Sequence, residues 1–258
     1  MEIPQPKTTI APFVRNILLM ENVEDRFHEI PIYADGFPGI MYSETDHPVH
    51  LLPRDKELSP FFLYGQTIEP IILTVQGPYK FVVLQLFPFA ARLLLGVDPK
   101  VLNDDCYDLR QVEGVNTAST LADLEAVAET EVQTRLMTTY IEELIKHSSH
   151  NPDHRIKMAV NMILKANGQV SVKDLRRDLY ITERTFERSF AREIGVTPKQ
   201  FARIIQFKHS LNQLSERDYL SLSEVGHESG FADQSHFIRT FKRFAGKTPK
   251  EFLREIEG

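Results

Sequence analysis

The stretch that decides the fold is residues 221–252, which read SLSEVGHESGFADQSHFIRTFKRFAGKTPKEF. Residues 171–201 repeat its pattern and read SVKDLRRDLYITERTFERSFAREIGVTPKQF. The first apolar positions of the two copies correspond at an offset of 50. After one residue is gained at a turn, the Phe, Gly and Pro positions correspond at 51. Two copies joined by residues 201–214 form a tandem, because a solenoid needs three or more repeats.

Each copy has the pattern of a helix-turn-helix. A short amphipathic segment leads into a tight turn, at residues 179–181 in the first copy and 229–231 in the second. Thr182 and Asp233 are suitable N-caps for the helix that follows each turn. On that helix two Phe residues lie four apart, so they share one face and are expected to enter the core.

Polar residues lie between and beside these Phe residues. They are Arg184, Glu187, Arg188 and Arg192 in the first copy and Gln234, Ser235, Arg239 and Arg243 in the second. One such unit would decide little, since buried Phe pairs and exposed Arg are ordinary features of a helix. Two matched units, both with Arg on the second helix, favour DNA binding at these eight residues.

The charge of the chain is divided between its halves. Residues 152–258 contain 19 basic and 14 acidic side chains, a balance of +5. Residues 1–151 contain 11 basic and 22 acidic side chains, a balance of -11, so the total of -6 conceals a basic second half. Such asymmetry indicates a basic binding domain attached to an acidic partner domain.

The repeated stretches also resemble the AraC/XylS family of transcriptional regulators. The segment GFADQSHFIRTFKRFAGKTPKEF is similar to the family signature, above all in GF-x-DQSHF-x-R-x-FK and in the ending G-x-TP-x-EF. The first copy, ITERTFERSFAREIGVTPKQF, is similar to the pattern of the family's first unit. The resemblance covers residue 153 to about residue 255. It implies seven helices, two recognition helices in successive major-groove segments, and a connecting helix that sets their separation.

The resemblance further implies which residues read bases. By position they are Arg184, Glu187 and Arg188 in the first copy and Gln234, Ser235 and Arg239 in the second. A carboxylate can accept from cytosine N4, and Arg can pair bidentately with guanine. The chain departs from the family at Arg176, where a small Ala is usual, and at Gln206, where a basic residue is common.

The predicted fold class is α+β, with a strand-rich, barrel-like sensor domain at residues 1–151 and an all-α domain with two helix-turn-helix units at residues 152–258. From Thr120 to His147 apolar residues recur at three- and four-residue steps, which predicts one long helix that Asn151-Pro152 ends. The apolar stripe of this helix could pack on its own domain or pair two chains. The other expected elements of the first half are strands at Phe13–Met20, Ile68–Val75 and Phe81–Phe87, a turn at Gly77-Pro78, and a short helix within Pro88–Leu95.

Catalysis and metal binding have little support in the sequence. His47 and His50 lie three apart without a suitably spaced acidic ligand, and Pro152 interrupts the series His147, His150 and His154. Cys106 lies among Asp104, Asp105 and Asp108, whose charge is expected to raise the pKa of its thiol. No Gly-rich phosphate loop or nucleophile elbow occurs. We therefore expect no enzyme, no cofactor and no metal site.

The remaining sequence features concern the cell compartment and the partners. One cysteine cannot form an internal disulfide, no apolar run reaches the roughly 18 residues of a membrane span, and the N-terminus lacks a signal-peptide pattern. We expect a bacterial, cytoplasmic transcription factor, an activator, that binds double-stranded DNA and RNA polymerase and no membrane. A small-molecule effector and a second copy of the chain are further candidate partners. The alternative is a small-molecule-binding or enzymatic front domain to which the second half is only an accessory DNA tether.

Overall fold

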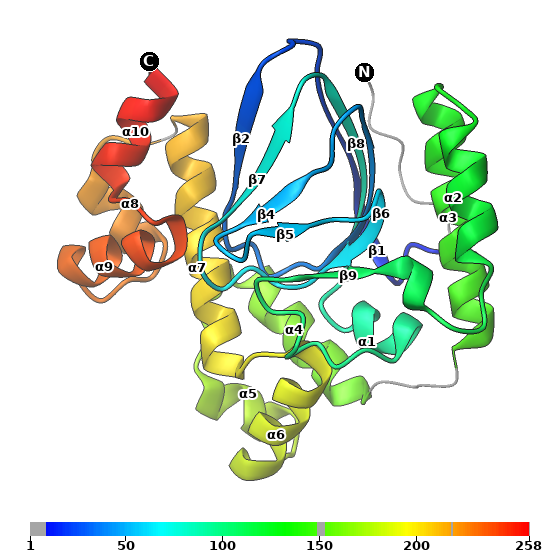
Figure 1. Ribbon diagram of the computed structural model, residues 1–258. Coiled ribbons are helices and arrows are strands. Elements are labelled where there is room, and N and C mark those ends of the chain that lie inside the picture. Colours follow the sequence, from blue (N-terminus) through cyan, green and yellow to red (C-terminus); the bar gives the residue numbers. More distant parts are fainter. Residues whose placement is uncertain (1–8, 149–152, 218, 258) are drawn as a thin grey trace. The chain divides into compact units, whose positions relative to one another are not determined.

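The computed structural model describes residues 9–148, 153–217 and 219–257 (Figure 1). The predicted helix break at Asn151-Pro152, and with it His150, lies outside these residues. The chain divides into two compact units. The first unit comprises Met1–Ile32, Phe37–Gln66 and Ile71–Pro152, and the second comprises Tyr33–Gly36, Thr67–Pro70 and Asp153–Gly258.

The first unit is built on two antiparallel sheets (Figure 1). One has five strands in the order β1-β8-β3-β6-β9, and the other has four in the order β2-β7-β4-β5. The sheets do not close into a continuous barrel, so the predicted strand-rich, barrel-like domain is confirmed in a loose sense. The strands are β1 (Val14–Asn22), β2 (Phe27–Ile32), β3 (Gly39–Thr45), β4 (His50–Leu52), β5 (Lys56–Glu57), β6 (Phe61–Tyr64), β7 (Ile71–Gln76), β8 (Tyr79–Leu86) and β9 (Cys106–Asp108).

The two sheets share one hydrophobic core. Met41 and Phe81 reach it from the five-stranded sheet, and Ile30 and Leu73 reach it from the four-stranded sheet. In β2 buried and exposed residues alternate, as expected for a strand with one face toward the core. In β8 every residue from 81 to 86 is buried, because this strand lies inside its sheet and also contacts helix α3.

The two strands predicted on either side of Gly77-Pro78 are present, but they do not pair with each other. β7 pairs with β2 and β4, whereas β8 pairs with β1 and β3. Gly77 has φ +83°, a left-handed conformation that glycine adopts without strain. The turn at Gly77 therefore carries the chain from one sheet to the other.

The prediction of a single helix from Thr120 to His147 is wrong. Helix α2 ends at Glu125 and helix α3 begins at Thr130. Between them, the Lys80 ammonium donates to the carbonyl of Ala128 at 2.7 Å and the Gln133 amide donates to the carbonyl of Val127 at 2.8 Å. These two hydrogen bonds, of which the one from Lys80 is long-range, satisfy backbone carbonyls between the helices. The helical segments of this unit are α1 (Ala90–Leu95), the 3-10 turn Leu109–Gln111, α2 (Thr117–Glu125) and α3 (Thr130–His147).

The apolar stripe of α3 packs within its own unit, against β8, α1 and α2. Tyr140 and Leu144 are buried as predicted, and the Tyr140 hydroxyl lies 2.9 Å from Oγ1 of Thr117. Leu136 is only half-buried, and Met137 takes the buried place beside it. Pairing of this helix with a second chain stays a prediction.

Residues 153–217 and 219–257 of the second unit form the seven helices that the family resemblance implies. Gly195 and Gly246 end α6 and α9 in the left-handed conformation, at φ +90° and +75°. Thr197 then caps α7, and Pro198 and Pro249 begin α7 and α10. The repeated G-x-TP pattern is thus a helix stop followed by a helix start. The helices are α4 (His154–Lys165), α5 (Val172–Asp178), α6 (Glu183–Ile194), α7 (Pro198–Glu216), α8 (Leu222–Glu228), α9 (Gln234–Ala245) and α10 (Pro249–Glu257).

Candidate nucleic-acid interface

The first helix-turn-helix consists of α5 and α6. Phe186 and Phe190 of α6 are fully buried, and their rings meet edge to face with centroids 5.7 Å apart. The four residues of α6 predicted as a DNA-binding surface are all exposed: Arg184, Glu187, Arg188 and Arg192. The helix therefore holds its apolar face in the core and presents these polar side chains to solvent.

The second helix-turn-helix, α8 and α9, repeats this arrangement. Phe237 and Phe241 are fully buried, with ring centroids 5.8 Å apart. The four predicted residues of α9 are again all exposed: Gln234, Ser235, Arg239 and Arg243. Gly226 of α8 faces α9 so closely that an added Cβ would lie 3.2 Å from Cβ of Phe237. Helices α8 and α9 therefore cross in direct contact.

The residue that corresponds to Gly226 in the first copy is Arg176, one of the two departures from the family pattern. Nε of Arg176 lies 3.7 Å from Oε2 of Glu183, the first residue of α6. The structure therefore accommodates the larger side chain by an ion pair between α5 and α6.

The eight predicted residues are alike in exposure but differ in the contacts they already make. In the part of the chain that the structure describes, the side chains of Arg184, Arg188 and Arg239 form no hydrogen bond or ion pair. Nε of Arg192, in contrast, lies 2.9 Å from Oε1 of Glu193, whose side chain is only 1% exposed. Three guanidinium groups are thus uncommitted, whereas Arg192 compensates a buried carboxylate.

The two predicted N-caps have different outcomes. The Asp233 carboxylate accepts from the backbone amide of His236 at 2.7 Å, as expected. Thr182 occupies the N-cap position of α6, but its hydroxyl donates to Oγ1 of Thr185 at 2.9 Å and makes no capping hydrogen bond. Thr182 is thus the N-cap residue as predicted, but its side chain bonds a neighbouring hydroxyl in place of the backbone.

One exposed cation of α9 was missed from the sequence. Lys242 lies three residues after Arg239 and is exposed. Its counterpart in the first copy is Ala191, so comparison of the repeats did not reveal it. Helical spacing from Arg239 is the signal that could have done so.

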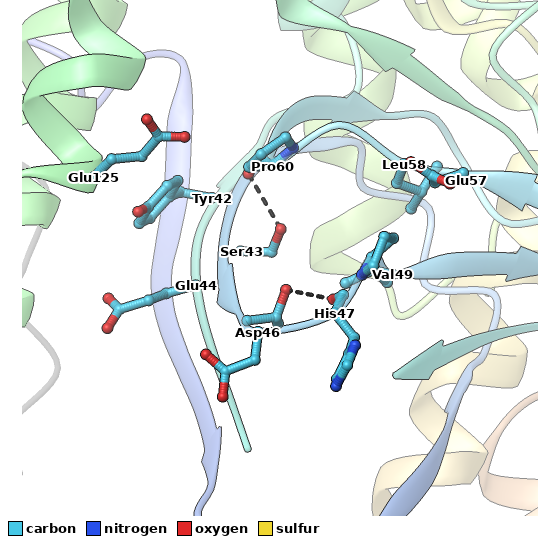
Figure 2. Close-up of a pocket in the computed structure, with 12 residues that line it drawn as sticks. Tyr42, Ser43, Glu44, Asp46, His47, Val49, Glu57, Leu58, Pro60 and Glu125 are labelled. Atoms are coloured by element: carbon cyan, nitrogen blue, oxygen red, sulfur yellow. Dashed lines mark hydrogen bonds between the residues drawn. The ribbon is translucent and has the colours of Figure 1, made fainter. Parts of the chain in front are cut away.

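The first unit contains a pocket of about 430 Å³ at the end of β3 (Figure 2). Ser43 of its wall donates to the carbonyl of Pro60 at 3.3 Å, and Thr45 donates to the carbonyl of His47 at 2.8 Å. Val49 and Leu58 supply apolar surface. Four carboxylates also line the pocket: Glu44, Asp46, Glu57 and Glu125.

Two groups of the pocket have shifted pKa values. Burial, followed by the charges of Glu44 and Glu125, raises the pKa of the Tyr42 hydroxyl to about 12. Burial opposes ionisation of Glu44, but hydrogen bonds from Lys80 and Gln133 outweigh it and lower the pKa of this carboxyl. At neutral pH the pocket therefore combines a neutral phenol with the ionised carboxylate of Glu44.

The other candidates from the sequence lie apart from this pocket or take no part in chemistry. His47 lines the pocket, whereas His50 lies in β4, and no group of three His, Cys, Asp or Glu side chains among the described residues could hold a metal ion. The pKa of the Cys106 thiol is raised to about 12, as predicted in direction, but burial is the largest cause and the charge of Asp105 comes second. Among the described residues, no helix has the length and apolar character needed to cross a membrane.

Comparison with known proteins identifies the second half most clearly. Residues 175–255 match a family described as a helix-turn-helix domain, and residues 2–108 match a domain of unknown function, DUF6597. The chain is 34% identical over 111 residues to the transcriptional activator RhrA of Rhizobium meliloti. It is 25% identical over 128 residues to the Msm operon regulatory protein of Streptococcus mutans. Residues 175–255 therefore form a helix-turn-helix domain of the AraC type.

The extent of the likeness differs between the relatives. The match to RhrA covers 42% of this chain and 34% of RhrA, and the match to the Msm protein covers 48% and 46%. The chain thus spans less than half the length of these two relatives. The solved structure of ToxT from Vibrio cholerae covers 95% of this chain and 100% of its own, with a TM-score of 0.55 and 14% identity. At that identity the likeness to ToxT concerns the fold.

Proposed function

We propose that the protein is a sequence-specific DNA-binding transcriptional regulator, an activator, whose first unit senses a small molecule. The observation that carries this proposal is the pair of recognition helices, each with a buried Phe pair and uncommitted exposed arginines. The AraC-type helix-turn-helix domain of residues 175–255 supports it. The test is selection of binding sites from random duplex DNA, in which a bipartite sequence should be enriched.

Within this proposal the exposed residues have different roles. Arg184, Arg188 and Arg239 are uncommitted, so they can reach guanine O6 and N7. Glu187 can accept from cytosine N4, and a base-reading role also falls to Gln234 and Ser235 by their place at the start of α9. Arg243 contacts a phosphate. Arg192 contributes mainly through its positive charge, because its guanidinium is held by Glu193.

Arg239 provides the sharpest test of base reading. Replacing Arg239 with Ala should weaken binding to the preferred site by about 1–3 kcal/mol and relax the choice at one base pair, since a bidentate Arg–guanine contact carries about that discrimination. Because Arg239 is exposed, the thermal stability should stay the same. Competition binding with single-base variants of the selected site measures both effects.

Arg243→Ala is the matched control, since Arg243 is an exposed Arg one helical turn further along α9. Loss of a phosphate contact should weaken all sequences about equally. If Arg239→Ala keeps the wild-type preference at every position of the site, Arg239 does not read a base.

The pocket of the first unit is the proposed effector site. A ToxT structure is described as bound to a substituted butenoic acid, which shows that this fold can hold a small molecule in that protein. Here four carboxylates line the pocket, so we propose a ligand that carries cationic or hydrogen-bond-donating groups and not an acid. The first unit binds this ligand without converting it.

Thermal shift in the presence of small molecules tests the effector site. Amines should raise the melting temperature of the protein and carboxylic acids should not, with about 2.7 kcal/mol of stabilisation at a ligand concentration 100 times its dissociation constant. Glu57→Gln should reduce the shift, while Glu21→Gln, an exposed residue of β1 outside the pocket, should not. Equal shifts with both variants would remove this pocket from the proposal.

The remaining partners follow from the same proposal. An activator acts in the cytoplasm beside RNA polymerase, and a second copy of the chain is a candidate partner. Sedimentation equilibrium of the purified protein checks the second of these.

A further inference from the structure

Three glutamines of the second unit converge on the turn between α8 and α9. They are Gln169, Gln206 and Gln213, and we call them the glutamine clamp. The Gln169 amide donates to the carbonyl of Glu228 at 2.6 Å. The Gln213 amide donates to the carboxylate of Glu228 at 2.7 Å, and its oxygen accepts from the buried Ser229 hydroxyl at 3.1 Å. Gln206 adds a longer contact of 3.5 Å to the carbonyl of Gly230.

Gln169 belongs to the first half of the DNA-binding unit. It lies between α4 and α5, two residues before Ser171, which caps α5. The preceding Gly168 has φ +77°, and an added Cβ would lie 2.2 Å from the carbonyl oxygen of Ala202 in α7. The loop that carries Gln169 therefore rests directly on the connecting helix. Its side chain reaches past that helix to the turn of the second helix-turn-helix.

Comparison of the two copies shows why the second turn contains glycine. Tyr180 and Gly230 occupy the same position and both have positive φ, +51° and +77°. The turn therefore accepts a side chain in this conformation, and that of Tyr180 is 95% exposed. At Gly230 an added Cβ would lie 2.6 Å from Cγ of Gln169. A side chain at Gly230 would be strained by the backbone conformation and would also have to displace the exposed side chain of Gln169.

We propose that the glutamine clamp ties the loop between α4 and α5, which supplies Gln169, and helix α7, which supplies Gln206 and Gln213, to the turn between α8 and α9, and so sets the spacing of the half-sites that the two helix-turn-helices read. Helix α7 already packs on the second helix-turn-helix, where the ring centroids of Phe207 and Phe241 lie 5.1 Å apart. Hydrogen bonds from Gln169 and from Gln213 of α7 add a polar restraint, because they hold the turn from which α9 begins. These glutamines are positioning residues, and their role in spacing rests on the proposed function.

A double-mutant cycle tests the contact without DNA. Gly230→Ala should raise the equilibrium constant of unfolding by a larger factor in the wild-type chain than in a Gln169→Ala chain. The reason is that Gln169→Ala removes the atoms that the new methyl group meets. The cost of a left-handed Ala is the same in both backgrounds and cancels. If the product of the two single-variant factors equals the factor of the double variant to within about twofold, the two residues are independent and the clamp is overturned.

Site selection tests the consequence for DNA. From duplexes with two half-sites and variable spacing, the wild-type protein should enrich one spacing. Gln169→Met keeps the side-chain volume without the hydrogen bond. It should reduce the preference for the selected spacing, relative to a spacing one base pair longer, by about fivefold. Affinity for a single half-site and the melting temperature should stay the same. Asn212 is an exposed residue of α7, and Asn212→Ala is the matched control. It should change none of the spacing preference, the half-site affinity and the melting temperature.

The outcomes separate the clamp from the proposed function. If the wild-type protein selects a bipartite site and Gln169→Met selects it with unchanged spacing preference, the clamp is wrong and the regulator stands. If the wild-type protein selects no duplex, both the proposed function and the spacing role fail.

Discussion

Raising the salt concentration from about 50 to about 200 mM should weaken specific duplex binding by about 10³-fold, although the protein carries a net charge of -6. The charge that matters is local, because residues 152–258 have a balance of +5. Each phosphate neutralised releases counterions, and about six phosphate contacts give a change of this size. The acidic first unit does not enter that count.

A fragment that begins at Asp153 should bind the same duplex with the same salt slope as the full chain. Fluorescence anisotropy at several salt concentrations measures both slopes. Arg243→Ala should reduce the slope by about 0.9, the contribution of one phosphate contact. If the folded fragment has no affinity for any duplex at low salt, the central proposal is lost.

Replacing Phe241 with Ala should destabilise the second helix-turn-helix by about 3–5 kcal/mol. Phe241 is fully buried, and its ring lies 5.1 Å from that of Phe207 and 5.8 Å from those of Phe237 and Phe252, measured between centroids. Removing the ring leaves a cavity among three aromatic neighbours that belong to different helices. The loss is a large fraction of the stability of an ordinary domain, which is about 5–15 kcal/mol.

Urea denaturation followed by far-ultraviolet circular dichroism measures this loss. Phe190→Ala is the matched variant of the first copy and should have a similar effect, because its position in the repeat is the same. Arg243→Ala, on the exposed face of α9, should change the free energy of unfolding by no more than about 0.5 kcal/mol. A loss below about 1 kcal/mol for Phe241→Ala would contradict the packing described for this helix.

The sequence by itself determined the helices of the second unit and the faces that they expose. Phe237 and Phe241 lie four apart, and Gly246 and Pro249 mark a stop and a start. These signals are local, since a helix is defined by hydrogen bonds between residues four apart and its ends by the nearest side chains. For the same reason the exposure of Arg239 could be predicted from its distance to Phe237. Local signals do not determine whether an exposed residue reads a base.

Only the tertiary structure decided which distant segments meet. The strands on either side of Gly77 pair with other strands, α2 and α3 separate where Lys80 binds the carbonyl of Ala128, and Gln169 donates to the carbonyl of Glu228. Each of these features depends on residues about fifty or more positions apart or on the choice between two sheets. Their energies come from burial and hydrogen bonds formed only after the chain has folded, so no local pattern in the sequence encodes them.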